Sequence, residues 1–144
     1  MSYEDVFMNV LLPYPDMPGN TYINNSSITI LLSADDVDFL LLGDLEEYGL
    51  NLLLNTYWLS YVEVVKANHH GEYNQMTPML YEYTSPNVCV ISVGANNYSL
   101  PNEELFIMLK NYQVECYTTE NSGMITFVIN GDDYKITEYV ENEF

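Results

Sequence analysis

Two neighbouring apolar runs constrain the fold of this chain more than any other feature of its sequence. Residues 27–33 and 37–42 are rich in isoleucine, leucine and phenylalanine, and the short polar segment Ala34-Asp35-Asp36 joins them. A connection of this length is typical of a β-hairpin. Nearly continuous apolar strands are expected where a sheet is covered on both faces. The pair therefore predicts a sheet inside a layered sandwich.

The rest of the chain alternates between strand and helix patterns. The best-marked helix has Pro101 near its start, Glu103 and Glu104 in its first turn and Lys110 in its last turn. Strands dominate the two ends, which predicts an α/β fold of mixed β-sheet layers with flanking helices, folded as a single domain over residues 1–144. Strands are expected at 6–12, 61–67, 88–93, 114–118, 124–130 and 134–139, and helices at 45–57, 75–83 and 101–112.

The chain is strongly acidic. Its 21 Asp and Glu against 3 Lys and Arg give a formal net charge of −18, and the three cations, Lys66, Lys110 and Lys135, lie far apart. Without a basic patch to neutralise phosphates, direct binding to DNA or RNA is not expected. The carboxylates are spread from Glu4 to Glu143, so the folded body should carry a negative field that attracts a basic protein surface. Adaptation to high salt is the alternative explanation.

The cysteines and the apolar segments bear on the cellular compartment. Cys89 and Cys116 fall in apolar, strand-like runs without a clustered metal-binding spacing, which predicts two buried free thiols. The sequence has no basic, apolar leader and no apolar run approaching about 18 residues. We therefore expect no signal peptide, no membrane span or membrane partner, and a cytoplasmic location, which is the host cytoplasm if a phage encodes the protein.

A series of short polar motifs follows the predicted strands. The motifs are Asn24-Asn25-Ser26-Ser27, Gly43-Asp44, His69-His70-Gly71, Ile91-Ser92-Val93-Gly94-Ala95-Asn96-Asn97, Pro101, Thr118, Ser122-Gly123 and Ile125-Thr126. Their order and spacing between Val6 and Ile136 resemble the C-terminal half of the metallo-β-lactamase-like domain of the competence DNA-channel protein ComEC and its soluble relatives. The resemblance implies half of an αββα sandwich.

The resemblance also implies a metal site, which this chain does not complete. Asp44 stands where the family has a metal-binding or bridging carboxylate, and His69 or His70 stands where it has its last histidine ligand. The upstream His-x-His-x-Asp-His motif is absent, Glu72 replaces a usual serine, and Leu100 replaces a usual histidine. A catalytic zinc takes typically three protein ligands, and adjacent histidines on an extended chain point to opposite sides. We therefore predict no bound metal, no cofactor and no catalysis, with Asp44, His69 and His70 as relic ligands.

Tyrosine is unusually frequent, with 14 in 144 residues. Tyrosine is common in interfaces because it offers a large contact area at small entropic cost. We expect Tyr73, Tyr81 and Tyr83 to be exposed and to contact a basic partner together with acidic side chains. The acidic residues expected in that interface are Glu46, Glu47, Glu72, Glu82, Glu103, Glu104, Asp132 and Asp133.

These features lead to three hypotheses about function. The first is a non-catalytic inhibitor of a nucleic-acid-binding effector, which acts by nucleic-acid mimicry as an anti-CRISPR or similar phage counter-defence protein would. The second is a metal-dependent hydrolase or nuclease whose missing ligands come from a second chain or a dimer mate. The third is a structural subunit that completes the sheet of a truncated partner.

Overall fold

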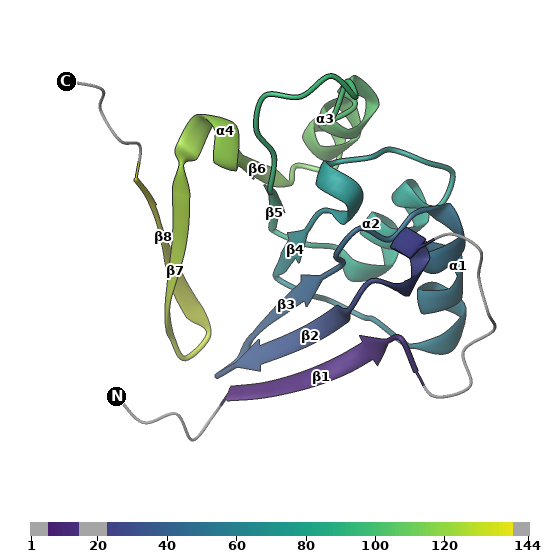
Figure 1. The fold of residues 1–144 in the computed structure, drawn as a ribbon. Coiled ribbons are helices and arrows are strands. Elements are labelled where there is room, and N and C mark those ends of the chain that lie inside the picture. The colour runs from purple at the N-terminus through teal and green to yellow at the C-terminus, as the bar shows by residue number, and fades with distance from the viewer. Residues whose placement is uncertain (1–5, 15–22, 140–144) are drawn as a thin grey trace.

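The structure is a computed structural model and describes residues 6–14 and 23–139. The described residues form a six-stranded sheet of order β1-β2-β3-β4-β5-β6 and a two-stranded sheet, β7-β8 (Figure 1). Helices flank the larger sheet, so the predicted mixed α/β fold is confirmed. The strands are β1 (Val6–Leu12), β2 (Thr29–Ala34), β3 (Val37–Leu41), β4 (Val64–Lys66), β5 (Val88–Ile91), β6 (Glu115–Thr118), β7 (Met124–Asn130) and β8 (Asp133–Tyr139). The helices are η1 (Ile23–Ser26), α1 (Glu47–Thr56), η2 (Asn68–His70), α2 (Thr77–Thr84), α3 (Glu103–Asn111) and α4 (Thr119–Ser122).

The larger sheet has an antiparallel part and a parallel part. Strands β1, β2 and β3 pair antiparallel, and the predicted hairpin at Asp35 and Asp36 connects β2 to β3. Strands β3 to β6 pair parallel, and α1, α2 and α3 form the three crossovers between them. Parallel neighbours need such long connections because each strand must start again from the same end of the sheet. All three helices lie on one face of the sheet (Figure 1).

The two faces of the sheet are buried by different elements. On one face, Leu50 of α1, Leu80 of α2 and Leu105 of α3 pack with Leu40 and other buried side chains in a single apolar cluster. On the other face, the β7-β8 hairpin covers Val37, Phe39, Val64 and Val88. The rings of Phe39 and Phe127 meet edge to face with centroids 5.2 Å apart. Double coverage explains why the central strands are almost continuously apolar.

Local backbone conformations account for the differences from the predicted elements. The strand expected at 61–67 is shortened to Val64–Lys66, and Tyr61 has a positive φ of 57°, which is incompatible with a regular strand. Helix α4 was not predicted; it is one short turn in which the Asn121 amide donates to the Thr118 hydroxyl at 3.3 Å, a side-chain cap. Across residues 6–14 and 23–139, no helix is both long and apolar enough to cross a membrane.

Candidate functional site

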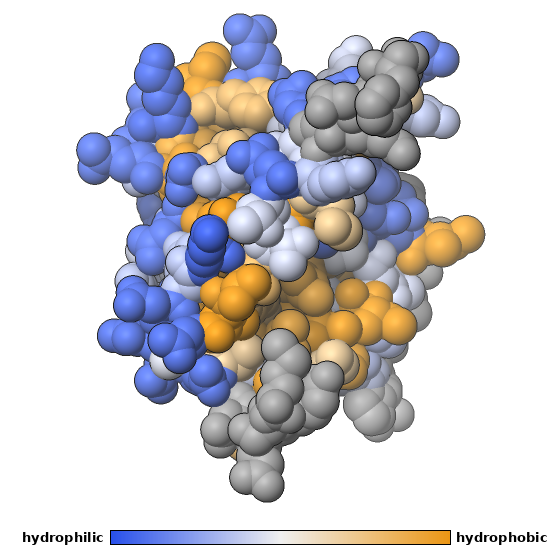
Figure 2. Space-filling model, turned by 90° about the vertical axis from the view of Figure 1, so that its left-hand side faces the viewer, coloured by the Kyte–Doolittle hydropathy of each residue, from blue (hydrophilic) through white to orange (hydrophobic). Residues whose placement is uncertain are grey.

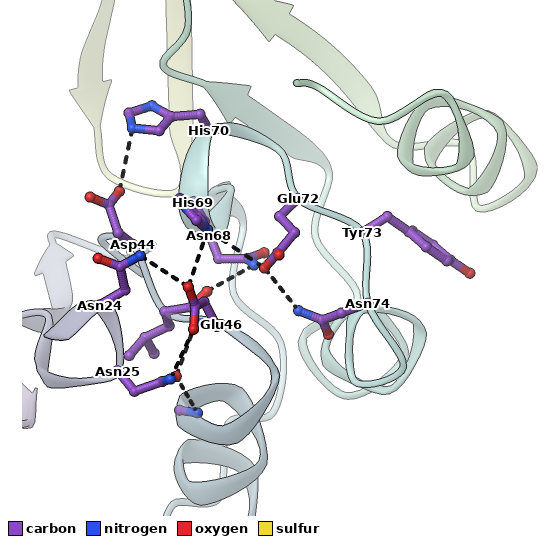
Figure 3. Close-up of polar contacts among 12 residues, drawn as sticks. Asn24, Asn25, Asp44, Glu46, Asn68, His69, His70, Glu72, Tyr73 and Asn74 are labelled. Carbon is purple, nitrogen blue, oxygen red and sulfur yellow. Dashed lines mark hydrogen bonds and ion pairs between the residues drawn. The ribbon is translucent and has the colours of Figure 1, made fainter. Parts of the chain in front are cut away.

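The predicted relic ligands gather at one edge of the sheet. Asp44 follows β3, His69 and His70 follow β4, and Ser92 follows β5. Parallel strands carry their C-terminal ends to the same edge, where ligand sites of α/β proteins are usually found. Figure 3 shows Asp44, His69 and His70 near Glu46, at the N-terminal end of α1. The sequence motifs therefore converge in space, although they are far apart along the chain.

Backbone contacts fix the two loops relative to each other. Gly43 has φ of +60°, and a Cβ atom there would lie 2.8 Å from the Ser27 Cβ, so only glycine fits without rearrangement. The Asp44 amide donates to the Ser27 hydroxyl at 3.1 Å. The His69 amide donates to the Gly43 carbonyl at 3.0 Å, which ties the β4 loop to the β3 loop.

The two histidines are not on an extended chain, so that expectation from the sequence is wrong. His69, His70 and Gly71 have φ of 38°, 57° and 90°, three consecutive residues in the left-handed region. The Gly71 amide closes this tight turn by donating to the Asn68 carbonyl at 2.8 Å. Left-handed conformations of residues other than glycine are uncommon and concentrate at functional sites. The turn places the ring centroids 6.1 Å apart.

His70 is oriented as a metal-binding histidine would be. Its Nδ1 lies 2.7 Å from the Ser92 carbonyl, which fixes the proton on Nδ1 when the ring is neutral. Its Nε2 lies 3.6 Å from Asp44 Oδ1. His70 and Asp44 are both about half exposed, so this pair is open to solvent.

His69 points toward different carboxylates. Its Nδ1 lies 3.7 Å from Glu72 Oε2 and 4.0 Å from Glu46 Oε1, too far for hydrogen bonds, and the atom has no hydrogen-bond partner among the residues that the structure describes. His69 and His70 thus serve two separate groups of side chains, as Figure 3 shows. The sequence alone does not distinguish their roles, because the left-handed turn decides where each ring points.

The metal implied by the family resemblance does not fit the donors that are present. Asp44 and His70 supply two ligands, whereas a catalytic zinc needs typically three protein ligands and an open position. Over the two described stretches of chain, no three side chains among histidine, cysteine, aspartate and glutamate come together as a metal-binding group. The absence of catalysis remains a prediction.

Glu46 has a structural function that the sequence did not indicate. Its two carboxylate oxygens accept hydrogen bonds from the side-chain amides of Asn24 at 3.0 Å and Asn25 at 3.2 Å. The Asn25 Oδ1 in turn accepts from the backbone amides of Glu46 at 3.1 Å and Gly49 at 2.7 Å. Asn25 therefore caps the first turn of α1 from a distant segment. Both carboxylate oxygens of Glu46 are therefore used in hydrogen bonds within the chain.

Lys66 is a charged residue near the site, and its place there was not predicted from the sequence. It ends the apolar strand β4 and lines a cavity of about 220 Å³ between the large sheet and the hairpin, together with Phe39, Val90 and Phe127. Burial lowers the pKa of Lys66, and the nearby Asp44 carboxylate opposes that shift. The sequence does contain a signal for this placement. Lys66 follows Val64 by two residues in the same strand, so the two side chains face the same side of the sheet.

The predicted interface tyrosines differ in exposure. Tyr83 is exposed and Tyr73 is partly buried. Tyr81 is 1% exposed, so its expected exposure is wrong; its hydroxyl lies 3.0 Å from the Cys89 sulfur in the core beneath α2. The helical period explains this, because Tyr81 lies beside Leu80 on the buried face of α2 and Tyr83 does not. Cys89 is the buried free thiol that was predicted, whereas Cys116 is only partly buried.

The predicted acidic residues do not gather on one surface. Glu47 lies at the start of α1, Glu82 is in α2, Glu103 and Glu104 start α3, and Asp132 and Asp133 lie at the tip of the β7-β8 hairpin (Figure 1). Glu46 and Glu72 come together around His69. Any single partner would therefore contact a subset of these residues. Their part in an interface remains a prediction.

Comparison with known proteins gives one informative similarity. No family model matches the chain. The chain is 26% identical over 128 residues to ComE operon protein 3 of Bacillus subtilis (strain 168). The alignment covers 88% of this chain and 16% of that protein, so the chain spans about a sixth of the length of its relative.

This similarity corrects the functional hypotheses. The predicted anti-CRISPR or phage counter-defence inhibitor, acting by nucleic-acid mimicry, is wrong, because nearly the whole chain is similar to a bacterial ComE operon protein. The alternative of a hydrolase completed by a second chain gains no support from the similarity or from the donor set. The predicted resemblance to a ComEC-type competence protein is supported by the similarity to this operon protein. The more specific prediction, that the chain is half of a metallo-β-lactamase-like domain, is not confirmed.

Proposed function

We propose that the chain serves in DNA uptake as a module that binds a basic protein surface and carries out no catalysis. The similarity to ComE operon protein 3 over 88% of the chain carries this proposal. The motif resemblance to the competence DNA-channel protein supports the same process. Because the similarity covers 16% of the relative, the proposed role is that of one module within larger machinery.

The charge of the chain supports a protein partner over a nucleic-acid partner. With 3 cations against 21 carboxylates, the protein would repel the phosphates of the transported strand. Proteins that hold DNA present lysine and arginine, and a net charge of −18 would attract such a surface over long range. The free thiols Cys89 and Cys116 support a reducing compartment, and we place the module on the cytoplasmic side of the uptake machinery.

The geometry of the candidate site supports binding without catalysis. Asp44 and His70 face each other, whereas His69 faces Glu46 and Glu72. The donors of the resembled metal site are thus divided between two groups. In this proposal the strained turn at His69 and His70 shapes the surface and orders the loops.

Natural transformation in a bacterium that encodes the chain tests the proposal. Deleting the gene is expected to lower the frequency of transformants without slowing growth. The wild-type gene and the triple variant Asp44→Asn/His69→Asn/His70→Asn should both restore transformation. Reversing an acidic pair in the partner interface should prevent restoration, and the pairs to test are Glu103→Lys/Glu104→Lys and Asp132→Lys/Asp133→Lys, all of which are exposed.

Two results would contradict the proposal in different ways. An unchanged frequency of transformants after deletion would remove the role in DNA uptake. Failure of the triple variant, with full activity of both charge reversals, would show that the carboxylate and histidines are required and the acidic surface is not. Circular dichroism of each purified variant distinguishes these outcomes from loss of the fold.

A further inference from the structure

Strand β1 is an uncharged, exposed apolar segment on a very acidic protein. Its sequence from Val6 to Leu12 contains one polar residue, Asn9, and no charged residue. Phe7 is 64% exposed and Met8 is 63% exposed, and Val6 and Val10 are exposed as well. Apolar side chains on both faces of one strand are therefore open to solvent. Such contiguous apolar surface commonly marks an interaction site.

The outer edge of β1 offers main-chain hydrogen bonds in addition to this apolar surface. Strand β1 is the first in the sheet order, and β2 is its sole partner strand among the residues that the structure describes. Natural edge strands are usually protected by charged residues, proline or bulges. In β1 the register irregularity lies between Val10 and Leu12, at its C-terminal end. The segment from Val6 to Val10 has no such protection.

The surface beside β1 extends onto β2. Met8 pairs with Leu32 and Val10 pairs with Ile30, so these side chains stand next to each other on the hairpin side of the sheet. Figure 2 views the molecule from the side of the β7-β8 hairpin and shows apolar side chains gathered in the middle of that face, next to a hydrophilic region. A strand added along β1 would continue this apolar surface.

We propose that the edge of β1 binds an extended strand of a basic protein by β-augmentation. This inference rests on the proposed function and identifies the surface and the form of its partner. Main-chain hydrogen bonds along the edge would supply affinity, and side chains beside Met8 and Phe7 would supply specificity. The arrangement has an apolar centre within an acidic body, which suits a partner strand with apolar residues in its middle and cations around them.

Charge complementarity selects this occupant over a second copy of the chain. A basic strand is attracted by the field of a body with a net charge of −18. A second copy carries the same charge, so its approach is opposed at low ionic strength. The two occupants respond in opposite ways to salt, because salt weakens the attraction to a basic strand and relieves the repulsion between copies.

Synthetic peptides and a matched pair of variants test the proposal on the full chain. The probe alternates threonine and valine with lysines at both ends, and a second peptide replaces these lysines with glutamates. The variants are Met8→Glu and Met124→Glu; Met124 is 64% exposed and lies on β7, so both substitutions add the same charge at equal exposure. Fluorescence anisotropy measures affinity, and hydrogen exchange locates the protected amides.

The lysine-flanked peptide is expected to bind and to protect amides of β1. Met8→Glu should weaken binding at least about tenfold although it makes the protein more acidic, because it removes burial of a methionine side chain. Met124→Glu should change affinity less than about twofold, since the site is elsewhere.

Three results would overturn the inference. The first is equal affinity of wild type and Met8→Glu, and the second is binding of the glutamate-flanked peptide as tightly as the lysine-flanked one. The third is a dimer that strengthens with salt and protects β1 without peptide, which would make the occupant a second copy. Salt-sensitive peptide binding that leaves the β1 amides unprotected would reject β1 as the binding surface. It would not contradict a basic partner as such, because the transformation experiment tests the proposed function independently.

Discussion

Replacing Asn25 by alanine should destabilise the protein strongly, although the residue lies outside every regular strand and α-helix. Asn25 is 1% exposed, and its Oδ1 is the acceptor for the amides of Gly49 and Glu46. Helix α1 has no side-chain cap of its own, since the N-cap residue Glu46 makes no capping hydrogen bond. Alanine would leave both amides at the start of α1 without their acceptor.

The expected loss can be worked out from these contacts. A buried amide without a partner costs about 1–3 kcal/mol, and the Glu46 amide is nearer to solvent than that of Gly49. Loss of the acceptor for both amides predicts a decrease of about 2–4 kcal/mol in the free energy of unfolding. For a chain of this size, that decrease corresponds to a fall of roughly 6–12 °C in Tm. A Cβ at Gly49 would lie 2.7 Å from Asn25 Oδ1, so substituting Gly49 should disturb the same contact.

Urea denaturation followed by circular dichroism provides the measurement. The matched control is Asn55→Ala, which removes an exposed asparagine whose amide donates to the Asn51 carbonyl within α1 at 2.8 Å. Its effect should stay within about 0.5 kcal/mol. Equal stability of Asn25→Ala and Asn55→Ala would refute the view that a distant side chain caps α1.

Two further substitutions test the backbone and the electrostatics of the site. Gly71→Ala should lower the free energy of unfolding by about 2–3 kcal/mol, because φ is +90° and the new Cβ would lie 2.7 Å from Pro101 Cβ. The control Gly131→Ala also has a positive φ, +65°, but the space around it is open. It should cost only about 1 kcal/mol in the same urea assay. For Lys66, burial lowers the folded-state pKa below its usual value of 10.5. The unfolded state therefore binds more protons between the folded-state and unfolded-state pKa values, and stability should rise with pH through that window. Lys66→Met should be more stable than wild type at pH 7 and should lack this rise; a parallel pH dependence in both proteins would exclude Lys66 as its source.

Sequence periodicity was sufficient to predict most of the fold. The apolar runs at 27–33 and 37–42 became β2 and β3, and the strands expected at 124–130 and 134–139 became β7 and β8. The signals are local in these cases, because turn residues and strand periodicity act over a few neighbours. The bounds of β4 and the short helix α4 were missed, since they depend on the left-handed Tyr61 and on a hydroxyl cap.

The candidate site was only partly predictable, for a physical reason. The motifs indicated that Asp44, His69 and His70 belong together, and parallel strand ends bring them to one edge. The division of the histidines between two groups of carboxylates depends on three consecutive left-handed residues. Glycine at position 71 is compatible with such a turn, but two histidines adopting it could not be anticipated from propensity. Long-range contacts such as those of Asn25 with Glu46 carry no periodic signal either.

Net charge and local sequence constrain different properties of an interface. The value of −18 belongs to the whole chain and sets long-range attraction, the rate of encounter and the sign of a partner's charge. It does not locate the contact, because exposed carboxylates are distributed over α1, α2, α3 and the β7-β8 hairpin. Strand β1 is both uncharged and exposed, so a partner backbone can approach it and displace water at small cost of desolvating charge. An acidic protein of this kind would therefore bind with a rate set by its carboxylates and a lifetime set by β1, so salt should act mainly on association and Met8→Glu mainly on dissociation.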